Sequence, residues 1–496
     1  MHFLNKFFKG IIWNQIGKIF ELILGLFYSI FIIRLLTEKE YGIYSYAIGF
    51  ISFLLMITSF GIREMLSKRN AELLEYPKSI LKLINLSLTF RFIIAIFLSL
   101  FIILLKKFIS KFFDFPELEE LFIIIFILFL LQSLIDIYLN TFTSLIKTKE
   151  ITQNKFLTQI INITATIIIY HITKNVLLAA FWGLIIGYSF SFLFYKYKLS
   201  SLLTIKNEIS NPIINKDILK LGLSAWVITI MTFGLENQID ILLIGNITKS
   251  PEQISYYNVA MQPIIRLHGF LFGWIGLVLP VASEFIMNKR MDDIPKLWNN
   301  LIKFNIILVV PAFSFLVILA NPIINLLFSS RYVNSIVLLQ VFAISSIIVN
   351  CLGMGINTSI LYAINNYKID LVVRIFSGFL NIILDLIFIK EFQALGAIIA
   401  SSFSAIFLVI IEYVYLTRKI KVKFPFIFFN KITFATLLGL VPLLFLNQDI
   451  RLLTGIIISP AIFFISLYIF KQLEQDMKDN LVRIEPKLGK ILIKLF

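Results

Sequence analysis

Residues 120–146 read ELFIIIFILFLLQSLIDIYLNTFTSLI, a stretch that is apolar over a length that can cross a lipid bilayer. Its only charged side chains are Glu120 at the start and Asp136 within it. The hydrocarbon core of a bilayer is about 30 Å thick, so a helix needs about 20 apolar residues to span it. The stretch therefore predicts a transmembrane helix.

Similar stretches precede and follow it, and together they predict an all-α polytopic membrane protein with about 14 transmembrane helices. The predicted spans lie near residues 11–35, 41–62, 80–105, 120–146, 156–172, 176–197, 219–245, 256–283, 302–327, 334–361, 369–389, 394–416, 432–447 and 451–471. The composition agrees, because 59% of the residues are hydrophobic and 15% are charged, whereas a soluble protein carries about 25% charged residues. The first stretch is too long for the core of a signal peptide, so we expect it to remain as the first span.

The residue types that serve most enzymes are scarce. The three histidines (His2, His171 and His268) do not stand at metal-ligand spacing, and we expect His268 to be a packing residue. The single cysteine, Cys351, cannot form an internal disulfide, and the sequence contains no P-loop and no HExxH motif. We therefore expect no catalytic residues, no metal and no cofactor.

The basic residues predict how the chain is oriented. The loops on the side of the N-terminus and the adjoining helix ends hold 31 of the 45 lysines and arginines, the opposite side holds ten, and four lie within spans. Loops rich in Lys and Arg tend to stay cytoplasmic, so both termini are predicted to be cytoplasmic. These residues are spread over eight segments, which argues against binding of nucleic acid and favours contact with anionic membrane lipids.

An internal repeat divides the chain. At an offset of 213 residues, Trp13 matches Trp226 and Tyr44 matches Tyr257, and the same offset pairs Ala47 with Ala260, Lys155 with Lys368 and Gly183 with Gly396. Each repeat holds six spans, so the two halves are expected to be parallel repeats with pseudo-symmetry. We predict an N-lobe at 1–200, a C-lobe at 201–420, two further spans at 421–471 and an amphipathic tail at 472–496 on the cytoplasmic surface.

Ionisable side chains inside spans mark candidate functional positions, because each costs about 2.5–3.5 kcal/mol at the centre of a membrane helix. Lys18 and Glu21 stand three residues apart on one face of the first span. They form either a local ion pair or a cavity-lining cation held by its neighbour. Arg91 has no acid within one turn on its own helix, so it is the first candidate for a cavity cation.

A second group of charges lies in the spans near 219–245 and 256–283. Glu236 and Asp240, spaced i and i+4, are predicted to share one helix face. Two close carboxylates disfavour being ionised together, which suits a site that couples transport to a proton. Alternatively, Glu236 pairs with Arg266 of the next span, while Asp240 is solvated near the outer end.

Further polar positions have simpler expected roles. Gln132 precedes Asp136 by four residues and Asn140 follows it by four, and this polar stripe is expected to face the interior of the N-lobe as a site of ion pairing or ion coupling. Charged groups near span ends can reach the interface by extending along the helix, and we expect this of Arg374, Asp385 and Glu412.

Several segments resemble polysaccharide transporters of the Wzx type, in the multidrug/oligosaccharidyl-lipid/polysaccharide (MOP) superfamily. These segments are RLLTEKEYGIYSYA at 34–47, DILLIG at 240–245 followed by ISYYNVA at 254–260, and ALGAIIA at 394–400. The resemblance implies a flippase of the cytoplasmic membrane that carries an undecaprenyl-diphosphate-linked oligosaccharide to the outer leaflet by alternating access between two lobes. Such a flippase serves the biosynthesis of a surface polysaccharide such as lipopolysaccharide or capsule, beside a polysaccharide polymerase.

That cargo would explain the cations within the spans. A diphosphate must carry its negative charge through a medium of low dielectric constant, and buried cations can neutralise it. Lys18, Arg91 and Arg266 are the residues that we expect to bind it.

Three other functions compete with this interpretation. Drug or cation antiporters of the MATE type usually have twelve spans and acidic cavities, whereas this chain has four cations within its spans. Flippases for the peptidoglycan precursor have fourteen spans but typically carry an arginine cluster in the N-lobe cavity, where this chain offers Lys18 and Arg91. Polytopic glycan polymerases or ligases usually present a long external loop, and the external loops predicted here have about 15 residues at most.

Overall fold

The computed structural model describes residues 23–73, 76–107, 117–202, 216–446, 455 and 458–466, and these are helical with short connections and no strand. Lys18, Glu21, Trp13 and the predicted tail at 472–496 lie outside the described residues. The first predicted span is described only as the helix Ile23–Leu35.

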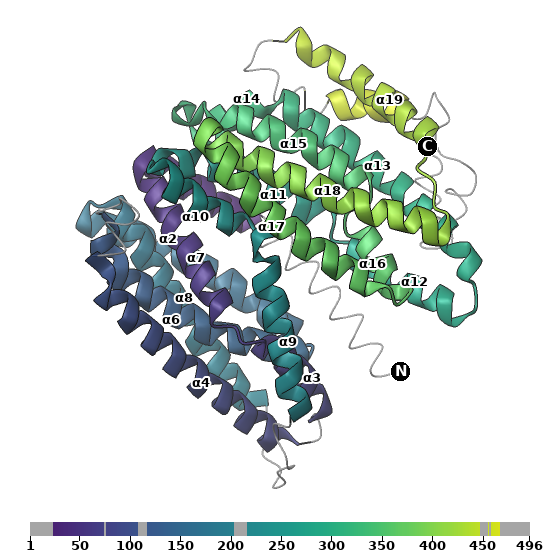
Figure 1. Cartoon of the computed structure of the whole chain (residues 1–496). Coiled ribbons are helices and arrows are strands. Elements are labelled where there is room, and N and C mark those ends of the chain that lie inside the picture. Colours follow the sequence, from purple (N-terminus) through teal and green to yellow (C-terminus); the bar gives the residue numbers. More distant parts are fainter. Residues whose placement is uncertain are drawn as a thin grey trace. The chain divides into compact units, whose positions relative to one another are not determined.

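The helices follow one another with few intervening residues (Figure 1). In chain order they are α2 (Glu38–Ile57), α3 (Ile62–Glu72), α4 (Pro77–Leu104), α6 (Glu117–Ser144), α7 (Thr148–Thr173), α8 (Val176–Leu202), α9 (Lys216–Thr232), α10 (Asn237–Thr248), α11 (Pro251–Leu271), α12 (Val278–Met287), α13 (Ile294–Ile318), α14 (Ala320–Ile323), α15 (Ser335–Cys351), α16 (Ile356–Ala363), α17 (Tyr367–Phe392), α18 (Ala394–Ile420) and α19 (Phe426–Leu444).

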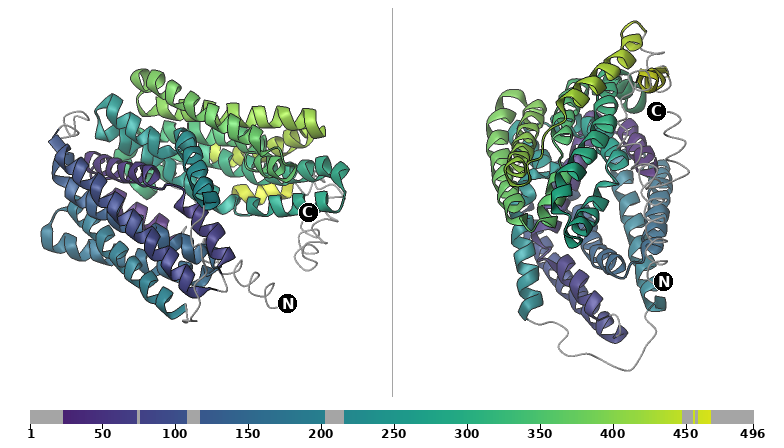
Figure 2. Two further views of the ribbon diagram at one scale, coloured as in Figure 1. Left: turned by 60° about the horizontal axis from the view of Figure 1, so that its bottom comes forward. Right: turned by 90° about the vertical axis from the view of Figure 1, so that its right-hand side faces the viewer.

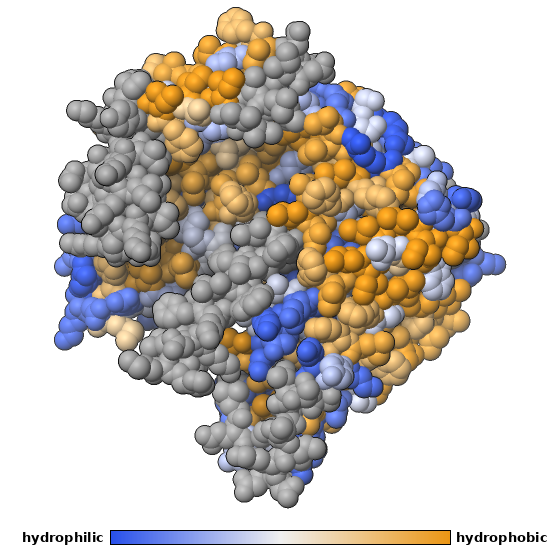
Figure 3. All heavy atoms as spheres, turned by 180° about the vertical axis from the view of Figure 1, so that it is seen from behind, coloured by the Kyte–Doolittle hydropathy of each residue, from blue (hydrophilic) through white to orange (hydrophobic). Residues whose placement is uncertain are grey.

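The described helices confirm a polytopic membrane protein. Eleven are long and apolar enough to cross a membrane, and a bent pair, residues 251–271 and 275–287, makes a twelfth candidate. Large apolar side chains also lie on the outside, as lipid contact requires; Phe97, for example, is 72% exposed. Apolar residues cover much of the described surface in Figure 3.

Several predicted boundaries change in the structure. The span predicted at 156–172 begins at Thr148, because the polar side chains in its first turns are bonded inside the protein: the Asn154 side chain donates to the Ser191 carbonyl of α8 at 3.1 Å. The predicted continuous helix at 219–245 is wrong, since the chain breaks at Glu236. The short span predicted at 432–447 is the longer helix α19.

The chain packs as two compact units, one of residues 1–258 and 389–393 and the other of 259–388 and 394–496. In the first unit α7 lies along α8, and α6 lies between α4 and α8 (Figures 1 and 2). The α7–α8 contact is close because Gly183 and Gly187 face Thr166 and Asn162, where a side chain would collide. Small residues of this kind are the usual contact surface between membrane helices.

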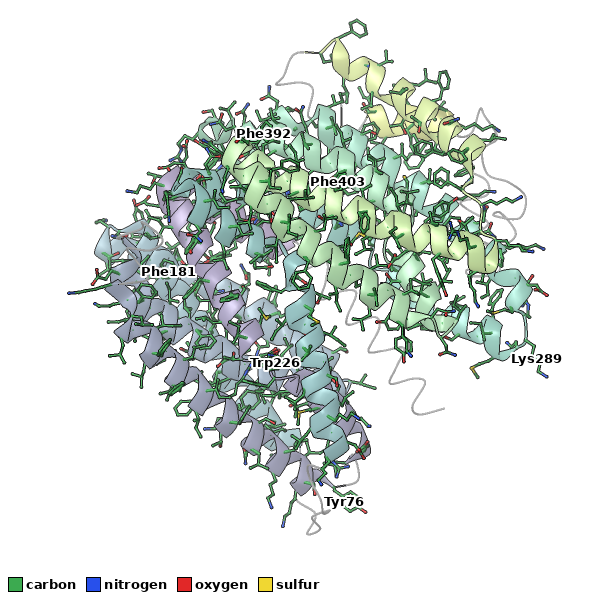
Figure 4. All side chains as sticks on the ribbon, in the orientation of Figure 1. Tyr76, Phe181, Trp226, Lys289, Phe392 and Phe403 are labelled. Atoms are coloured by element: carbon green, nitrogen blue, oxygen red, sulfur yellow. The ribbon has the colours of Figure 1, made fainter. Side chains whose placement is uncertain are left out.

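The α2 and α10 helices also meet through glycines in the first unit. Gly42 lies against the backbone of Pro251, Gly49 against Ile241 and Gly245 against the ring of Tyr46. Nearby, the Trp226 indole of α9 (Figure 4) donates to the Ile57 carbonyl at 2.9 Å. Backbone groups approach where side chains are absent, so these contacts fix α9 and α10 to the N-terminal helices.

The sequence repeat is visible at the starts of α2 and α11. Thr37 caps α2 through a capping box with Glu40, and Ser250, 213 residues later, accepts from the Gln253 backbone N–H at 3.4 Å. One hydrogen bond joins two equivalent positions: Asn258 donates to Ser45 at 2.7 Å, and these residues are also 213 apart.

The offset does not stay constant along the chain. Helix α7 begins at Thr148 and α17 at Tyr367, so the offset there is 219 (367 − 148). The pairing of Lys155 with Lys368 and of Gly183 with Gly396 without a gap is therefore wrong. The predicted lobes at 1–200 and 201–420 stay a prediction, because the packing units divide the chain at different residues.

The second unit is built around α13. This helix packs against α15 and α19, and α15 in turn packs against α18. Polar pairs are buried where α13 meets α16 and α15: the Trp298 indole donates to the Asn357 side chain of α16 at 2.8 Å, and Asn305 donates to the Asn350 carbonyl of α15 at 2.7 Å. Between α15 and α16 the chain breaks at Gly353 and Gly355, whose φ angles are +94° and +78°. Those left-handed angles suit glycine and rarely other residues.

The glycine contact between α2 and Pro251 can be tested by adding one methyl group. Gly42→Ala places a Cβ against the Pro251 backbone, which cannot move aside as a side chain can. We expect an unfolding free energy lower by about 1–3 kcal/mol, seen as a lower apparent Tm in detergent. The control is Gly276→Ala, where nothing lies within 4 Å of the added Cβ. Equal Tm values for the two variants would contradict this packing.

Candidate functional site

Arg91 is buried in the first unit and pairs with a carboxylate of the neighbouring helix. Its side chain, on α4, is among the largest that are fully enclosed, with 1% of the residue exposed. Its Nη2 donates to the Asp136 Oδ2 of α6 at 3.3 Å, and the Asp136 Oδ1 accepts from Asn140 at 3.1 Å. The structure thus brings together two of the predicted site residues, on helices that the sequence alone could not place side by side.

The Arg91–Asp136 pair uses only part of what the guanidinium can bind. Arginine carries five N–H donors. Among the described residues, the buried Arg91 Nε and Nη1 have no hydrogen-bond partner. The Asp136 side chain is 42% exposed, so the pair is open on one side. Buried donors without acceptors are costly, and an anion bound there would satisfy them.

Tyrosines gather on other helices of the same unit. The Tyr28 hydroxyl lies near those of Tyr44 and Tyr188, and Tyr188 lies near Gln132 of α6. The Tyr44 ring also contacts Phe181 of α8, with a centroid distance of 5.3 Å. The polar stripe predicted on the span at 120–146 therefore faces other helices of its unit. Gln132 lies near Tyr188 of α8, and Asp136 accepts from Arg91 of α4.

The structure corrects the predicted placement of Asp240. This residue is 1% exposed and accepts a hydrogen bond from the Tyr257 hydroxyl at 2.6 Å, so the expectation that it is solvated is wrong. The bond gives the buried carboxyl group a donor that lies 17 residues away along the chain, a separation that leaves no mark in a helical pattern.

Glu236 does not share a helix face with Asp240. It lies at the break before α10 with extended backbone (φ −91°, ψ 136°), and its side chain is exposed. The predicted i, i+4 face required one continuous helix, so that expectation is wrong. Arg266 is half-buried on α11 in the second unit, and its pairing with Glu236 of the first unit stays a prediction.

Four side chains form a polar cluster in the second unit that the sequence analysis missed. Arg374 of α17 donates through Nε to Asp370 Oδ1 at 2.8 Å and through Nη2 to Thr358 Oγ1 of α16 at 2.7 Å. Thr358 donates to Glu412 Oε1 of α18 at 3.2 Å. We call these residues the Glu412 cluster. Glu412 is fully buried, so the expected reach to the interface is wrong for Glu412. For Arg374, whose side chain is 28% exposed, it stays a prediction.

Asp385 is a second correction of the same kind. It is 0% exposed and accepts from the Asn381 side chain at 3.2 Å, one turn earlier on α17. Spacings of four residues, Asp370 to Arg374 and Asn381 to Asp385, are the sequence signal that identifies both groups. Among the described residues, no group of three or more His, Cys, Asp or Glu side chains is placed to hold a metal ion.

Comparison with known proteins identifies relatives of this chain. Residues 31–337 match the family model described as polysaccharide biosynthesis protein. The chain is 22% identical over 253 residues to the probable low-salt glycan biosynthesis flippase Agl15 of Haloferax volcanii, covering 50% of this chain and 53% of that protein. It is 21% identical to the uncharacterized membrane protein MJ1068 of Methanocaldococcus jannaschii over 39% of this chain and 38% of that protein. The chain thus matches about half the length of these curated relatives or less.

Solved structures share the fold. Lipid II flippase MurJ in an inward closed conformation gives a TM-score of 0.71 at 21% identity and covers 92% of this chain and 98% of its own. An inward-facing MATE multidrug transporter of the MOP superfamily gives 0.62 at 14% identity, covering 83% and 98%. These likenesses confirm the predicted fold, that of MOP transporters.

The Asp240 hydrogen bond predicts a specific loss of stability. Tyr257→Phe removes the hydroxyl that donates to the buried carboxylate, and we expect the unfolding free energy to fall by about 1–3 kcal/mol. The measurement is the apparent Tm of the purified protein. Tyr367→Phe, at an exposed tyrosine, is the matched control and should leave the Tm unchanged. A Tyr257→Phe protein as stable as this control would contradict the assigned bond.

Proposed function

The chain belongs to the polysaccharide biosynthesis protein family, and from that membership we propose that it is a flippase for an undecaprenyl-diphosphate-linked oligosaccharide. The cargo would move from the cytoplasmic to the outer leaflet of the cell membrane. Both termini would be cytoplasmic, as the distribution of Lys and Arg favours. The product would enter a surface polysaccharide such as lipopolysaccharide or capsule, through a polymerase that acts on it in the outer leaflet.

The observation that carries this proposal is the buried guanidinium of Arg91. A diphosphate offers several charged oxygens, and a guanidinium binds such oxygens through two parallel N–H groups. Two Arg91 nitrogens have no partner among the described residues, while a third holds Asp136 at 3.3 Å. Asp136 keeps the cation compensated when no cargo is bound, so Arg91 can stay in a membrane segment throughout a transport cycle.

Other polar residues in the unit that holds Arg91 suit a sugar chain. Tyrosine rings offer flat apolar faces, and their hydroxyls, together with the Gln132 amide, can donate to or accept from sugar hydroxyls. Tyr44 and Tyr188 belong to the same unit as Arg91. Lys18 and Arg266 are further candidate cations for the diphosphate, on the basis of their charge and position in predicted spans.

Movement of the cargo would follow from the two repeats. We propose that the lobes at 1–200 and 201–420 expose the cargo alternately to the two sides of the membrane, as transporters with parallel repeats do. No residue is assigned a catalytic role, because translocation of a lipid-linked glycan makes and breaks no covalent bond.

A lipid-linked precursor of the cell wall is the second candidate cargo. The likeness of the fold to Lipid II flippase MurJ supports it. Both cargoes place a diphosphate between a lipid and a sugar, so Arg91 would serve either. The difference lies in the sugar, and analysis of the accumulated lipid distinguishes the two.

Substitution of Arg91 tests the proposal in the native host. Arg91→Ala, present at normal level in place of the natural chain, should cause the lipid-linked oligosaccharide to accumulate and the surface polysaccharide to fall. Arg91→Lys keeps the charge but loses the two-pronged binding, so we expect an intermediate amount of both. Quantitative mass spectrometry of extracted lipids provides the measurement.

Two controls separate transport from folding. Arg331→Ala removes an exposed arginine and should behave as the natural protein. Arg91→Ala combined with Asp136→Ala leaves no unpaired buried charge, so it should restore the level of folded protein without restoring transport. Normal transport by Arg91→Ala at normal expression would overturn the role of Arg91.

A further inference from the structure

The Glu412 cluster contains more negative than positive charge in a membrane segment. It combines one guanidinium, Arg374, with two carboxylates, Asp370 and Glu412, around the hydroxyl of Thr358. All four residues lie in helices α16, α17 and α18 of the second unit, so the cluster is complete within one compact unit. We infer that Glu412 is a proton-binding site, and that loading it with a proton is coupled to transport of the cargo.

Arg374 compensates one of the two carboxylates and not the other. Its Nε lies 2.8 Å from Asp370 Oδ1, while its Nη2 lies 4.0 Å from Glu412 Oε1. The Nη2 donates instead to the Thr358 hydroxyl at 2.7 Å. Asp370 therefore holds the guanidinium as an ion pair, and Glu412 is the carboxylate left over.

Glu412 has little else to stabilise an ionised carboxylate. It is 0% exposed, and its Oε1 accepts one hydrogen bond, from Thr358 at 3.2 Å. Its Oε2 is buried without a hydrogen-bond partner among the described residues. An ion buried without full compensation is strongly destabilising, and a carboxyl group avoids that destabilisation by taking up a proton.

The groups that face Glu412 from neighbouring elements do not change this balance. From α16 this is Thr358, and from α17 they are Asp370 and Arg374. Tyr362 of α16 lies near Asp370, Arg374 and Tyr367. In α15, which packs against α18, the only titratable side chain is Cys351. The next charges on α18 itself, Arg418 and Lys419, lie more than one turn away in the last turn of the helix.

Proton uptake would change the side-chain contacts that connect α16, α17 and α18. With Glu412 neutral, the Arg374–Asp370 ion pair balances the cluster, and the new O–H can donate to Asp370, which lies within interaction range. When the proton leaves, the second carboxylate competes for Arg374 and Thr358. Arg374 is 28% exposed, which gives the proton a polar route to the cluster. The Gly353–Gly355 break lets α16 present Thr358 to both partners, so α16, α17 and α18 would respond together.

Infrared spectroscopy of the full chain in lipid tests the proton site without any cargo. A protonated carboxyl absorbs separately from an ionised one, so Glu412→Gln should remove a carboxylic acid band that the natural protein shows at neutral pH. Glu391→Gln, at an exposed carboxylate near the end of α17, is the control and should keep the band. Spectra of Glu412→Gln and the natural protein that are identical in this region would overturn the inference.

Transport then tests the coupling, which rests on the proposed flippase function. Lipid extracted from a host that lacks this chain is the probe, and purified protein is placed in liposomes with an imposed pH gradient. The gradient should accelerate flipping by the natural protein and by Glu412→Asp, which keeps a carboxyl, but not by Glu412→Gln. A Glu412→Gln protein that still responds to the gradient would contradict the coupling.

The two experiments test the proton site at Glu412 and the proposed flippase function separately. If the infrared band depends on Glu412 but the natural protein flips no lipid, the proposed flippase function fails and the proton site stands. If lipid is flipped while the band and the gradient response are independent of Glu412, the function stands and the proton site is overturned.

Discussion

The structure depends on one constraint: a charge inside a membrane segment must be compensated within the protein, because lipid offers it neither water nor a counter-ion. Arg91 meets that constraint through Asp136 and Arg374 through Asp370, while the buried Asp240 carboxyl group accepts a hydrogen bond from the Tyr257 hydroxyl. Two of these three bonds join different helices. The charges therefore specify which helices are neighbours, in a chain whose apolar surface would tolerate many arrangements.

Close packing supplies the rest of the specificity. Apolar side chains face lipid and protein alike, so burial of apolar surface alone selects no partner helix. Glycines do select, because they let backbones approach at defined points: Gly42 against Pro251 in the first unit, and Gly187 against Asn162 between α7 and α8. The Ser45–Asn258 hydrogen bond links two positions related by the repeat. The duplication can thus be recognised in the structure near the start of each copy, as a hydrogen bond between equivalent residues.

The sequence predicts the helical membrane fold because apolar length is a local property, and α4, α6 and α8 lie close to their predicted ranges. It predicts helix boundaries and the partners of polar side chains less well, because tertiary contacts determine them. Polar first turns hid the start of α7. The break at Glu236 follows a single glycine, Gly234, which a helix can tolerate. Asp385 and Glu412 near span ends were expected to reach the interface but are buried. Their actual partners lie in side-chain networks, partly on other helices. The candidate site shows the same division: Arg91 and Asp136 are each conspicuous in the sequence, but only the fold pairs them.

The central claim is that this chain moves a lipid-linked glycan across the membrane, and the most direct measurement is mass spectrometry of lipids from the native host with and without the chain. We expect one diphosphate-linked oligosaccharide to accumulate in its absence and to return to its normal level when the chain is restored. No accumulation of any lipid-linked glycan, together with greater toxicity of cationic drugs, would contradict the account and favour an extruder of cations.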